Sequence, residues 1–341
     1  MSTTLSIILA VYNEARHLKD VLNSLLSQEV HDIQLELLVI DGNSTDQSVE
    51  IATQFARQDA RVRVFSNPQR STPYAFNIGL QHANGQYVAI LGAHALYAPD
   101  YIATCLKEML AHNAAGCSGR IIAKPPRQSL QALLTYWAMN HPFGVSTRSF
   151  RSIPEGDADS LPYPVFRTSV LRDLGGYDVR MIRNQDNEMN YRIRQAGYHL
   201  WVTWKTHAIY YTKPTLEGLF RYAINNGSWC AVSYKNSPRS LGLRHYIPAI
   251  FFCVVGVSVL LALISLLLQW PVLITTIILL PLFLHLAVGV LASLFLCIRE
   301  RNLCALFMPG VFLGFHLVYG YGFIANAILQ EPFAKPDMST A

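Results

Sequence analysis

Charged side chains are scarce in this chain. Asp, Glu, Lys and Arg make up only 14% of its 341 residues, while 51% of the residues are hydrophobic. A typical soluble domain carries about 25% charged residues. The shortage is local, because residues 246–298 and 303–330 contain no Asp, Glu, Lys or Arg. This distribution argues against a wholly soluble protein and indicates that one part of the chain has apolar surroundings.

Several signatures of cofactor and metal sites are also missing. The six cysteines form no Cys-x-x-Cys pair and have no histidine at zinc-site spacing, so neither a zinc site nor a disulfide framework is expected. No Gly-x-Gly-x-x-Gly and no Gly-x-x-x-x-Gly-Lys-Ser/Thr follows a predicted strand, which removes the dinucleotide and P-loop fingerprints. The net charge of +5 is modest, and we expect no nucleic-acid partner.

Both uncharged segments are long enough to cross a membrane. A helical span needs about 20 apolar residues, so residues 246–298 can form two spans that break near Pro271, and residues 303–330 can form a third. Buried helices of a soluble protein are the alternative, which the length of the first uncharged segment disfavours. We therefore predict about three transmembrane helices and a multi-pass protein of the inner or plasma membrane.

Basic residues flank these segments and predict their orientation. They are Lys235, Arg239 and Arg244 before the first span, and Arg299 and Arg301 between the second and the third. By the positive-inside rule both flanks, and with them the large N-terminal part, lie in the cytoplasm. No signal peptide is expected, because residues 1–4 carry no basic residue and the apolar run at 5–11 is too short. An odd number of spans would place the tail at 331–341 outside, whereas a re-entrant third segment would return it.

The N-terminal part alternates between strand and helix patterns. Short apolar runs at residues 5–11, 35–40 and 86–91 predict strands, as does the alternation of polar and apolar residues at 61–65. Helical patterns or polar turns follow them. This alternation predicts an α/β domain with a mainly parallel sheet. In such sheets ligands bind outside the carboxyl ends of the strands.

Polar residues follow three of the predicted strands. Tyr12, Asn13 and Glu14 come after the first strand, Asp41 ends the second, and His94 follows the fourth. We therefore expect these side chains to lie at one edge of the sheet.

A phosphate group at this edge would need a cationic partner, because no glycine-rich loop is present. The nearest candidate is Arg70, which stands in the loop before the helix that carries Asn77.

Two acidic residues, Asp186 and Glu188, stand at the start of another predicted helix, which ends near Gly197. The residues expected to face the core recur at helical spacing: Met189, Ile193 and Ala196. Those expected to face away are polar: Arg192, Arg194 and Gln195. An ionised carboxylate on a rigid helix start can accept a proton from a substrate hydroxyl. The alternative is that both acids only complement the helix dipole.

Four motifs in this order resemble those of family 2 glycosyltransferases with the GT-A fold. They are Ala-Val-Tyr-Asn-Glu at 10–14, Val-Ile-Asp-Gly-Asn-Ser-Thr-Asp at 39–46, Tyr-Ala-Phe-Asn-Ile-Gly-Leu at 74–80 and Asn-Gln-Asp-Asn-Glu at 184–188. The Ala-His-Ala at 93–95 and the Gly-Gly-Tyr-Asp at 175–178 are most similar to the succinoglycan-type exopolysaccharide glycosyltransferases, which also carry C-terminal membrane spans.

The resemblance implies a nucleotide-diphospho-sugar transferase fold, followed by a C-terminal helical transmembrane region. The expected parts are a nucleotide-sugar-binding half at 1–125, an acceptor and catalytic half at 126–214, an interfacial amphipathic segment at 215–245, transmembrane helices at 246–330 and a tail at 331–341.

On the donor side, the resemblance implies that Asp41 accepts a hydrogen bond from the uracil of a UDP-sugar. Tyr12 would stack on the nucleotide and Arg70 would approach the pyrophosphate. The remaining donor-side residues would be Asn13, Glu14, Asn77 and Ala93.

On the acceptor side, the resemblance makes Asp186 the general base that removes a proton from the acceptor hydroxyl, with inversion at the anomeric carbon. Tyr163, Arg183 and Gln185 would line this side, and Gln185 stands where many relatives carry Glu.

The sequence departs from the family at Gly92, where relatives usually place the first Asp that binds a divalent cation. Three hypotheses follow: His94 binds Mn²⁺ or Mg²⁺ weakly with substrate oxygens, or catalysis proceeds without a metal with help from Arg70 or Arg183, or the site is degenerate.

The predicted function is a membrane-anchored inverting glycosyltransferase that transfers a sugar from a nucleotide-sugar to a lipid-linked glycan in polysaccharide synthesis. Its partners would be the donor, the acceptor, membrane lipids and a polysaccharide assembly complex. Two alternatives stay open: transfer to a polyprenyl phosphate, and a non-catalytic scaffold or sugar-nucleotide sensor.

Overall fold

The structure is a computed structural model that describes residues 3–30, 32–145 and 153–329. The described residues form two compact units. The α/β unit runs to Lys124 and resumes from 153 to Tyr211, and the helical unit contains 125–145 and 212–329. The predicted tail at 331–341 lies outside the described residues.

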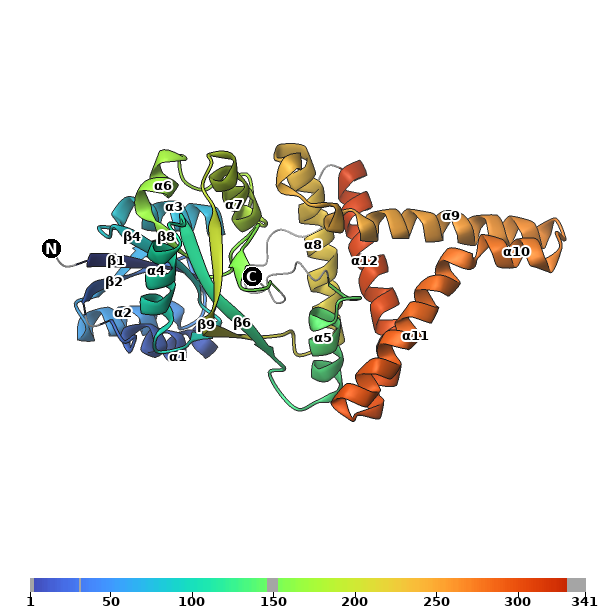
Figure 1. Cartoon of the computed structure of the whole chain (residues 1–341), viewed down its shortest axis with the longest axis horizontal. Coiled ribbons are helices and arrows are strands. Elements are labelled where there is room, and N and C mark those ends of the chain that lie inside the picture. The colour runs from blue at the N-terminus through green and yellow to red at the C-terminus, as the bar shows by residue number, and fades with distance from the viewer. Residues whose placement is uncertain (1–2, 31, 146–152, 330–341) are drawn as a thin grey trace. The chain divides into compact units, whose positions relative to one another are not determined.

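Strands and helices alternate in the first half of the α/β unit, as the sequence predicts (Figure 1). The strands are β1 (Thr3–Val11), β2 (Ile33–Asp41), β3 (Val62–Ser66), β4 (Tyr87–Gly92), β5 (Ala95–Tyr97), β6 (Gly116–Lys124), β7 (Gly156–Asp157), β8 (Val165–Arg167) and β9 (Leu200–Tyr211). The helices are α1 (Ala15–Leu26), α2 (Ser48–Gln58), α3 (Thr72–His82), α4 (Tyr101–Ala111), α6 (Thr168–Asp173) and α7 (Gln185–Gln195).

Within the described residues, these strands form one mixed sheet in the order β3-β2-β1-β4-β8-β6-β9-β5, with β7 paired to β9. The first four are parallel, as are β6 and β9, whereas β8 is antiparallel to both of its neighbours. The register pairs Val11 with Asp41, Asp41 with Ser66 and Ala10 with Gly92. The predicted strand ends therefore meet at one edge, which confirms the expected α/β arrangement.

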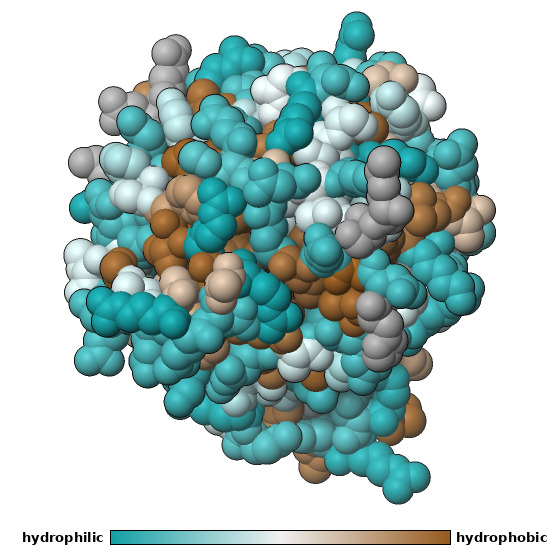
Figure 2. All heavy atoms as spheres, turned by 90° about the vertical axis from the view of Figure 1, so that its left-hand side faces the viewer, coloured by the Kyte–Doolittle hydropathy of each residue, from teal (hydrophilic) through white to brown (hydrophobic). Residues whose placement is uncertain are grey.

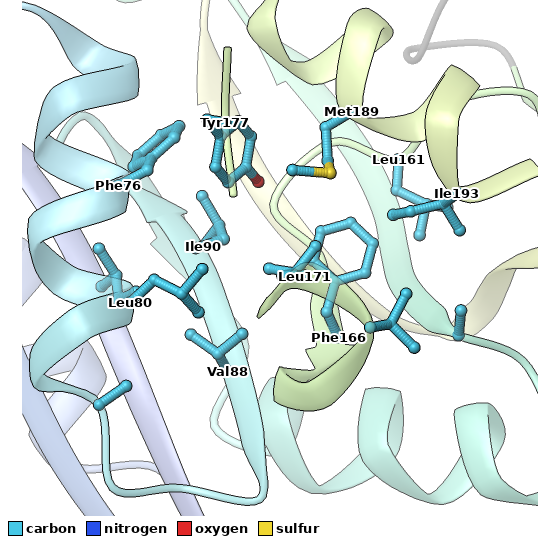
Figure 3. Close-up of a cluster of buried hydrophobic side chains, with 14 of the residues drawn as sticks. Phe76, Leu80, Val88, Ile90, Leu161, Phe166, Leu171, Tyr177, Met189 and Ile193 are labelled. Atoms are coloured by element: carbon cyan, nitrogen blue, oxygen red, sulfur yellow. The ribbon is translucent and has the colours of Figure 1, made fainter. Parts of the chain in front are cut away.

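A buried cluster joins this sheet to the helix that carries the two acids. In Figure 3, Met189 and Ile193 point from α7 into a group that includes Tyr177 and Phe166. Met189 and Ile193 are completely buried, as predicted. The prediction for Ala196 is wrong: it is exposed, because α7 ends at Gln195 and Ala196 is already its C-cap.

The helical unit contains α5 (Leu130–Asn140), α8 (Leu216–Asn236), α9 (Ile247–Leu267), α10 (Val272–Ile278), α11 (Leu280–Glu300) and α12 (Met308–Leu329). Among the described residues, three helical stretches are long and apolar enough to cross a membrane, at Leu243–Leu267, Leu280–Glu300 and Leu303–Leu329. The interruption after the first of them includes Pro271, as predicted.

The two units differ in what their surfaces expose. The face of the α/β unit that Figure 2 shows is covered mostly by hydrophilic side chains. In contrast, large hydrophobic side chains are exposed along α9, α10 and α11, among them Leu260, Leu267, Val272 and Leu291. Such a surface is unfavourable in water and suits the interior of a bilayer.

Small residues bring α8 and α12 together within the helical unit. The Ser228 hydroxyl donates to the Gly322 carbonyl at 3.1 Å. A Cβ atom on Gly227 would overlap the Tyr319 carbonyl, and one on Gly322 would overlap that of Ile224. Close backbone approach through glycine is typical of helix pairs in membranes. The interfacial position predicted for 215–245 stays a prediction.

The position of α5 differs from the boundary drawn from the sequence. Residues 125–145 cluster with the helical unit, although the sequence placed them in the 126–214 half. The hydroxyl of Thr135 donates to the carbonyl of Thr215 before α8, at 3.4 Å. The roles assigned to 1–125 and 126–214 stay predictions.

Candidate active site

The loops after β1 and β2 are bonded to each other at the edge of the sheet. Asn13 has a left-handed backbone with φ of 54°, and its side-chain oxygen accepts a hydrogen bond from the Thr45 amide at 2.8 Å. The Asn13 amide in turn donates to the Ser44 hydroxyl at 2.9 Å. Asn13 thus holds the loop after β1 against the loop after β2.

Asp46 connects the loop after β2 to the start of α1. Its carboxylate accepts hydrogen bonds from the amides of Ala15 and Ser48, both at 3.0 Å. The Ser48 hydroxyl accepts one from the Glu14 amide at 2.8 Å. Burial acts to raise the pKa of Asp46, but the hydrogen bonds from Ser48 and Ala15 outweigh it and lower that pKa below its usual 3.8.

This shift predicts a pH-dependent contribution of Asp46 to stability. Because its pKa is lower in the folded protein, the stabilisation is complete above the unfolded pKa and is lost as the pH falls through the folded one. Asp46→Asn should therefore lower the melting temperature at pH 7, and its difference from the unmodified protein should shrink below about pH 4. Asp20→Asn, at an exposed position of α1, is the control. A difference that is the same at pH 7 and pH 3.5 would contradict the prediction.

Asp41 is buried at the end of β2, with 6% of its surface exposed. Ser44 holds both carboxylate oxygens, through its hydroxyl at 2.6 Å and its amide at 3.0 Å. The carboxylate is thus fixed at the strand end before any ligand binds. The hydrogen bond to uracil that the family resemblance implies stays a prediction.

The loop after β3 packs against Asp41 and exposes Arg70. The Asn67 amide donates to the Asp41 carbonyl at 2.7 Å, and Arg70 has a left-handed backbone with φ of 50°. Asn67 Oδ1 and Ser71 Oγ are buried, and within the described residues neither atom has a hydrogen-bond partner. Neither residue was among those predicted for the site, although both lie near Arg70 in a polar loop.

The structure shows Asn77 in a positioning role. Its side-chain amide donates to the Tyr177 carbonyl and its oxygen accepts from the Tyr177 amide, both at 2.8 Å. The residue thereby holds the segment that leads to Asp186. Contact with a nucleotide-sugar stays a prediction for Asn77.

The end of β4 lacks the donor set that a divalent cation requires. Gly92 has no side chain, Ala93 is buried, and His94 Nδ1 lies 3.6 Å from Glu14 Oε1. Such cations prefer several oxygen ligands. Among the described residues, no group of three or more His, Cys, Asp or Glu side chains could hold a metal. The residues present therefore do not fit a protein-held cation here.

Asp186 lies on the first turn of α7 and is exposed. Its Oδ1 accepts a hydrogen bond from the Asn187 amide at 2.8 Å. Burial raises the pKa of Tyr177, and the charge of Asp186 raises it further. Arg183 and Gln185, predicted on the acceptor side, are half-buried beside the helix start.

Glu188 forms an ion pair with Arg192, a residue that was predicted to face the solvent. Its two carboxylate oxygens accept from Arg192 Nε at 2.6 Å and Nη2 at 2.7 Å. Arg192 also donates to the carbonyls of Leu174 at 2.6 Å and Gly176 at 2.8 Å. The prediction that Arg192 faces away is wrong, because these carbonyls come from a loop that closes over α7.

Comparisons with known proteins bear on the family of this chain and on its fold. Residues 6–175 match the family model "Glycosyl transferase family 2". The succinoglycan biosynthesis protein ExoA of Rhizobium meliloti is 29% identical over 251 residues, which is 72% of this chain and 75% of that protein. A dolichyl N-acetyl-alpha-D-glucosaminyl phosphate 3-beta-D-2,3-diacetamido-2,3-dideoxy-beta-D-glucuronosyltransferase of Methanococcus voltae is 24% identical over 66% of this chain and 72% of its own length.

Among solved structures, the mannosyltransferase PcManGT of Pyrobaculum calidifontis, in complex with GDP-Man and Mn²⁺, is similar in fold. Its TM-score is 0.58 at 18% identity, covering 96% of this chain and 87% of that one. The α/β unit is thus a GT-A glycosyltransferase domain. The chain belongs to glycosyltransferase family 2, as its motifs predicted.

Proposed function

We propose that this glycosyltransferase is anchored in a membrane and transfers a sugar from a UDP-sugar to a lipid-linked glycan, with inversion at the anomeric carbon. The observation that carries the proposal is the placement of Asp186. An exposed carboxylate stands on the first turn of a helix whose other face is completely buried at Met189 and Ile193. A base held this rigidly can meet an acceptor hydroxyl in a defined geometry.

The membrane part supports the choice of acceptor. Three helical stretches could cross a bilayer, counted over the described residues, and a lipid-linked acceptor is confined to the same plane. Tethering enzyme and acceptor together raises their effective concentration. The named relatives act in succinoglycan biosynthesis and on a dolichyl-linked sugar phosphate. We place the α/β unit on the cytoplasmic side, because the basic flanks favour it.

A donor screen tests the proposal. Washed membranes that contain the protein are incubated with radiolabelled UDP-glucose, UDP-N-acetylglucosamine or GDP-mannose, and with lipid extract from the source cells. We expect label from one UDP-sugar to move into the organic phase. Label transferred to added polyprenyl phosphate alone would favour the polyprenyl-phosphate alternative. Nucleotide binding without transfer from any donor would favour the sensor alternative and contradict the proposal.

A further inference from the structure

Gly92 stands beneath an aromatic ring. A Cβ atom at position 92 would lie 2.7 Å from Cε1 of Tyr163 and 3.5 Å from its hydroxyl oxygen. Contacts shorter than 3.0 Å are essentially never seen for real Cβ atoms. Any side chain at the end of β4 therefore has to displace the Tyr163 ring, and an Asp side chain would need the same space.

The backbone that carries this ring is hydrogen-bonded on several sides, so the ring can leave Gly92 only by rotation of its own side chain. The Tyr101 hydroxyl donates to the Tyr163 carbonyl at 2.8 Å. The next carbonyl, that of Pro164, accepts from the Ile90 amide on β4 at 2.9 Å, and the preceding one, that of Pro162, accepts from the Ser118 hydroxyl. These bonds hold Tyr163 at φ of 49°, a conformation that is unusual for a bulky residue.

A second tyrosine fixes Gly92 from the other side. The Tyr97 hydroxyl accepts a hydrogen bond from the Gly92 amide at 2.7 Å and donates one to the Gly92 carbonyl at 3.1 Å. The rings of Tyr97 and Tyr163 meet edge to face at 5.6 Å. Tyr97 thus contacts both Gly92, through hydrogen bonds, and the Tyr163 ring, through edge-to-face packing.

From this geometry we infer that Tyr163 occupies the place of a metal-binding carboxylate, and that the donor nucleotide binds here without a cation held by the end of β4. The inference rests on the proposed function for the identity of the ligand. It also accounts for the absence of an Asp at position 92, because its side chain would overlap the Tyr163 ring. Building a cation site here needs two changes together, Gly92→Asp and Tyr163→Ala. The first change alone would place the carboxylate against the ring, and the second alone would supply no carboxylate.

The first test measures UDP binding by calorimetry on the full-length protein in detergent, with EDTA or with Mn²⁺. The affinity of the unmodified protein should be the same within about twofold in both buffers, and so should that of Tyr163→Phe, which keeps the ring. The double variant Gly92→Asp/Tyr163→Ala should bind UDP about tenfold more tightly with Mn²⁺ than with EDTA. The matched control Gly92→Asn/Tyr163→Ala, which lacks the charge, should show no such gain.

A tenfold loss of UDP affinity of the unmodified protein in EDTA would overturn the inference. So would Mn²⁺-dependent UDP binding by Gly92→Asp with Tyr163 still present.

The second test does not depend on any nucleotide. Gly92→Ala should lower the melting temperature by about 2–10 °C when Tyr163 is present, and should change it little in the Tyr163→Ala background. An equal effect of Gly92→Ala in both backgrounds would contradict the packing. If neither UDP nor GDP binds, the proposed donor is wrong, while this cycle still decides whether Tyr163 fills the space at Gly92.

Discussion

Asp186→Asn is expected to lower the rate of sugar transfer by about 10²- to 10⁴-fold, the usual contribution of a general base. The amide keeps the shape of the side chain but cannot take a proton from the acceptor hydroxyl. UDP affinity should stay within about twofold, because Asp186 stands at the start of α7, whereas Asp41, the residue predicted to bind the base, stands at the end of β2. Single-turnover transfer and UDP titration measure the two effects separately.

Asp173→Asn is the matched control for this variant. Asp173 is also an exposed acid, at the end of α6, and its amide variant should transfer sugar at the unmodified rate. Transfer by Asp186→Asn at the rate of Asp173→Asn would remove Asp186 from the mechanism.

Arg192→Met is expected to lower the free energy of unfolding of the α/β unit by about 3–5 kcal/mol, as is usual when one partner of a buried ion pair is removed. Glu188 would keep a charge with only 6% of its side chain exposed, and the carbonyls of Leu174 and Gly176 would lose their donor. Since α7 carries Asp186, the rate of transfer should fall as well. Chemical denaturation and the transfer assay give the two values.

The control for this prediction is Arg180→Met, which removes another arginine of the same region. Arg180 pairs with Asp178 at 2.6 Å, but 66% of its side chain is exposed, and exposed pairs contribute little to stability. Equal loss of stability in the two variants would show that the bonds of Arg192 have no special weight.

Local patterns predicted much of this molecule. The apolar runs at 5–11 and 86–91 are strands β1 and β4, and the uncharged segments are helices long enough to cross a membrane, for the residues that the structure describes. These features depend on side-chain periodicity and on the transfer of apolar surface out of water, which neighbouring residues determine. The strand ends that meet at one edge, where Val11 pairs with Asp41 and Ala10 with Gly92, followed from the parallel sheet.

Contacts across long stretches of sequence lay beyond such patterns. The sequence predicts that Arg192 faces the solvent, because it shares a helix face with other polar residues. In the structure it donates hydrogen bonds to the carbonyls of Leu174 and Gly176. Asn77 belongs to a family motif, but its amide is bonded to Tyr177, a hundred residues away. Hydrogen-bond partners of this kind depend on the folded arrangement of loops.

The sequence by itself determined the family, the alternating α/β pattern, the apolar helices and the acid at the start of α7, because each is written in adjacent or periodically spaced residues. The absence of an Asp at position 92 was equally plain, but its structural reason was not. Only the tertiary structure decided that the ring of Tyr163 fills that space, because a close contact between residues 92 and 163 depends on how two distant segments pack.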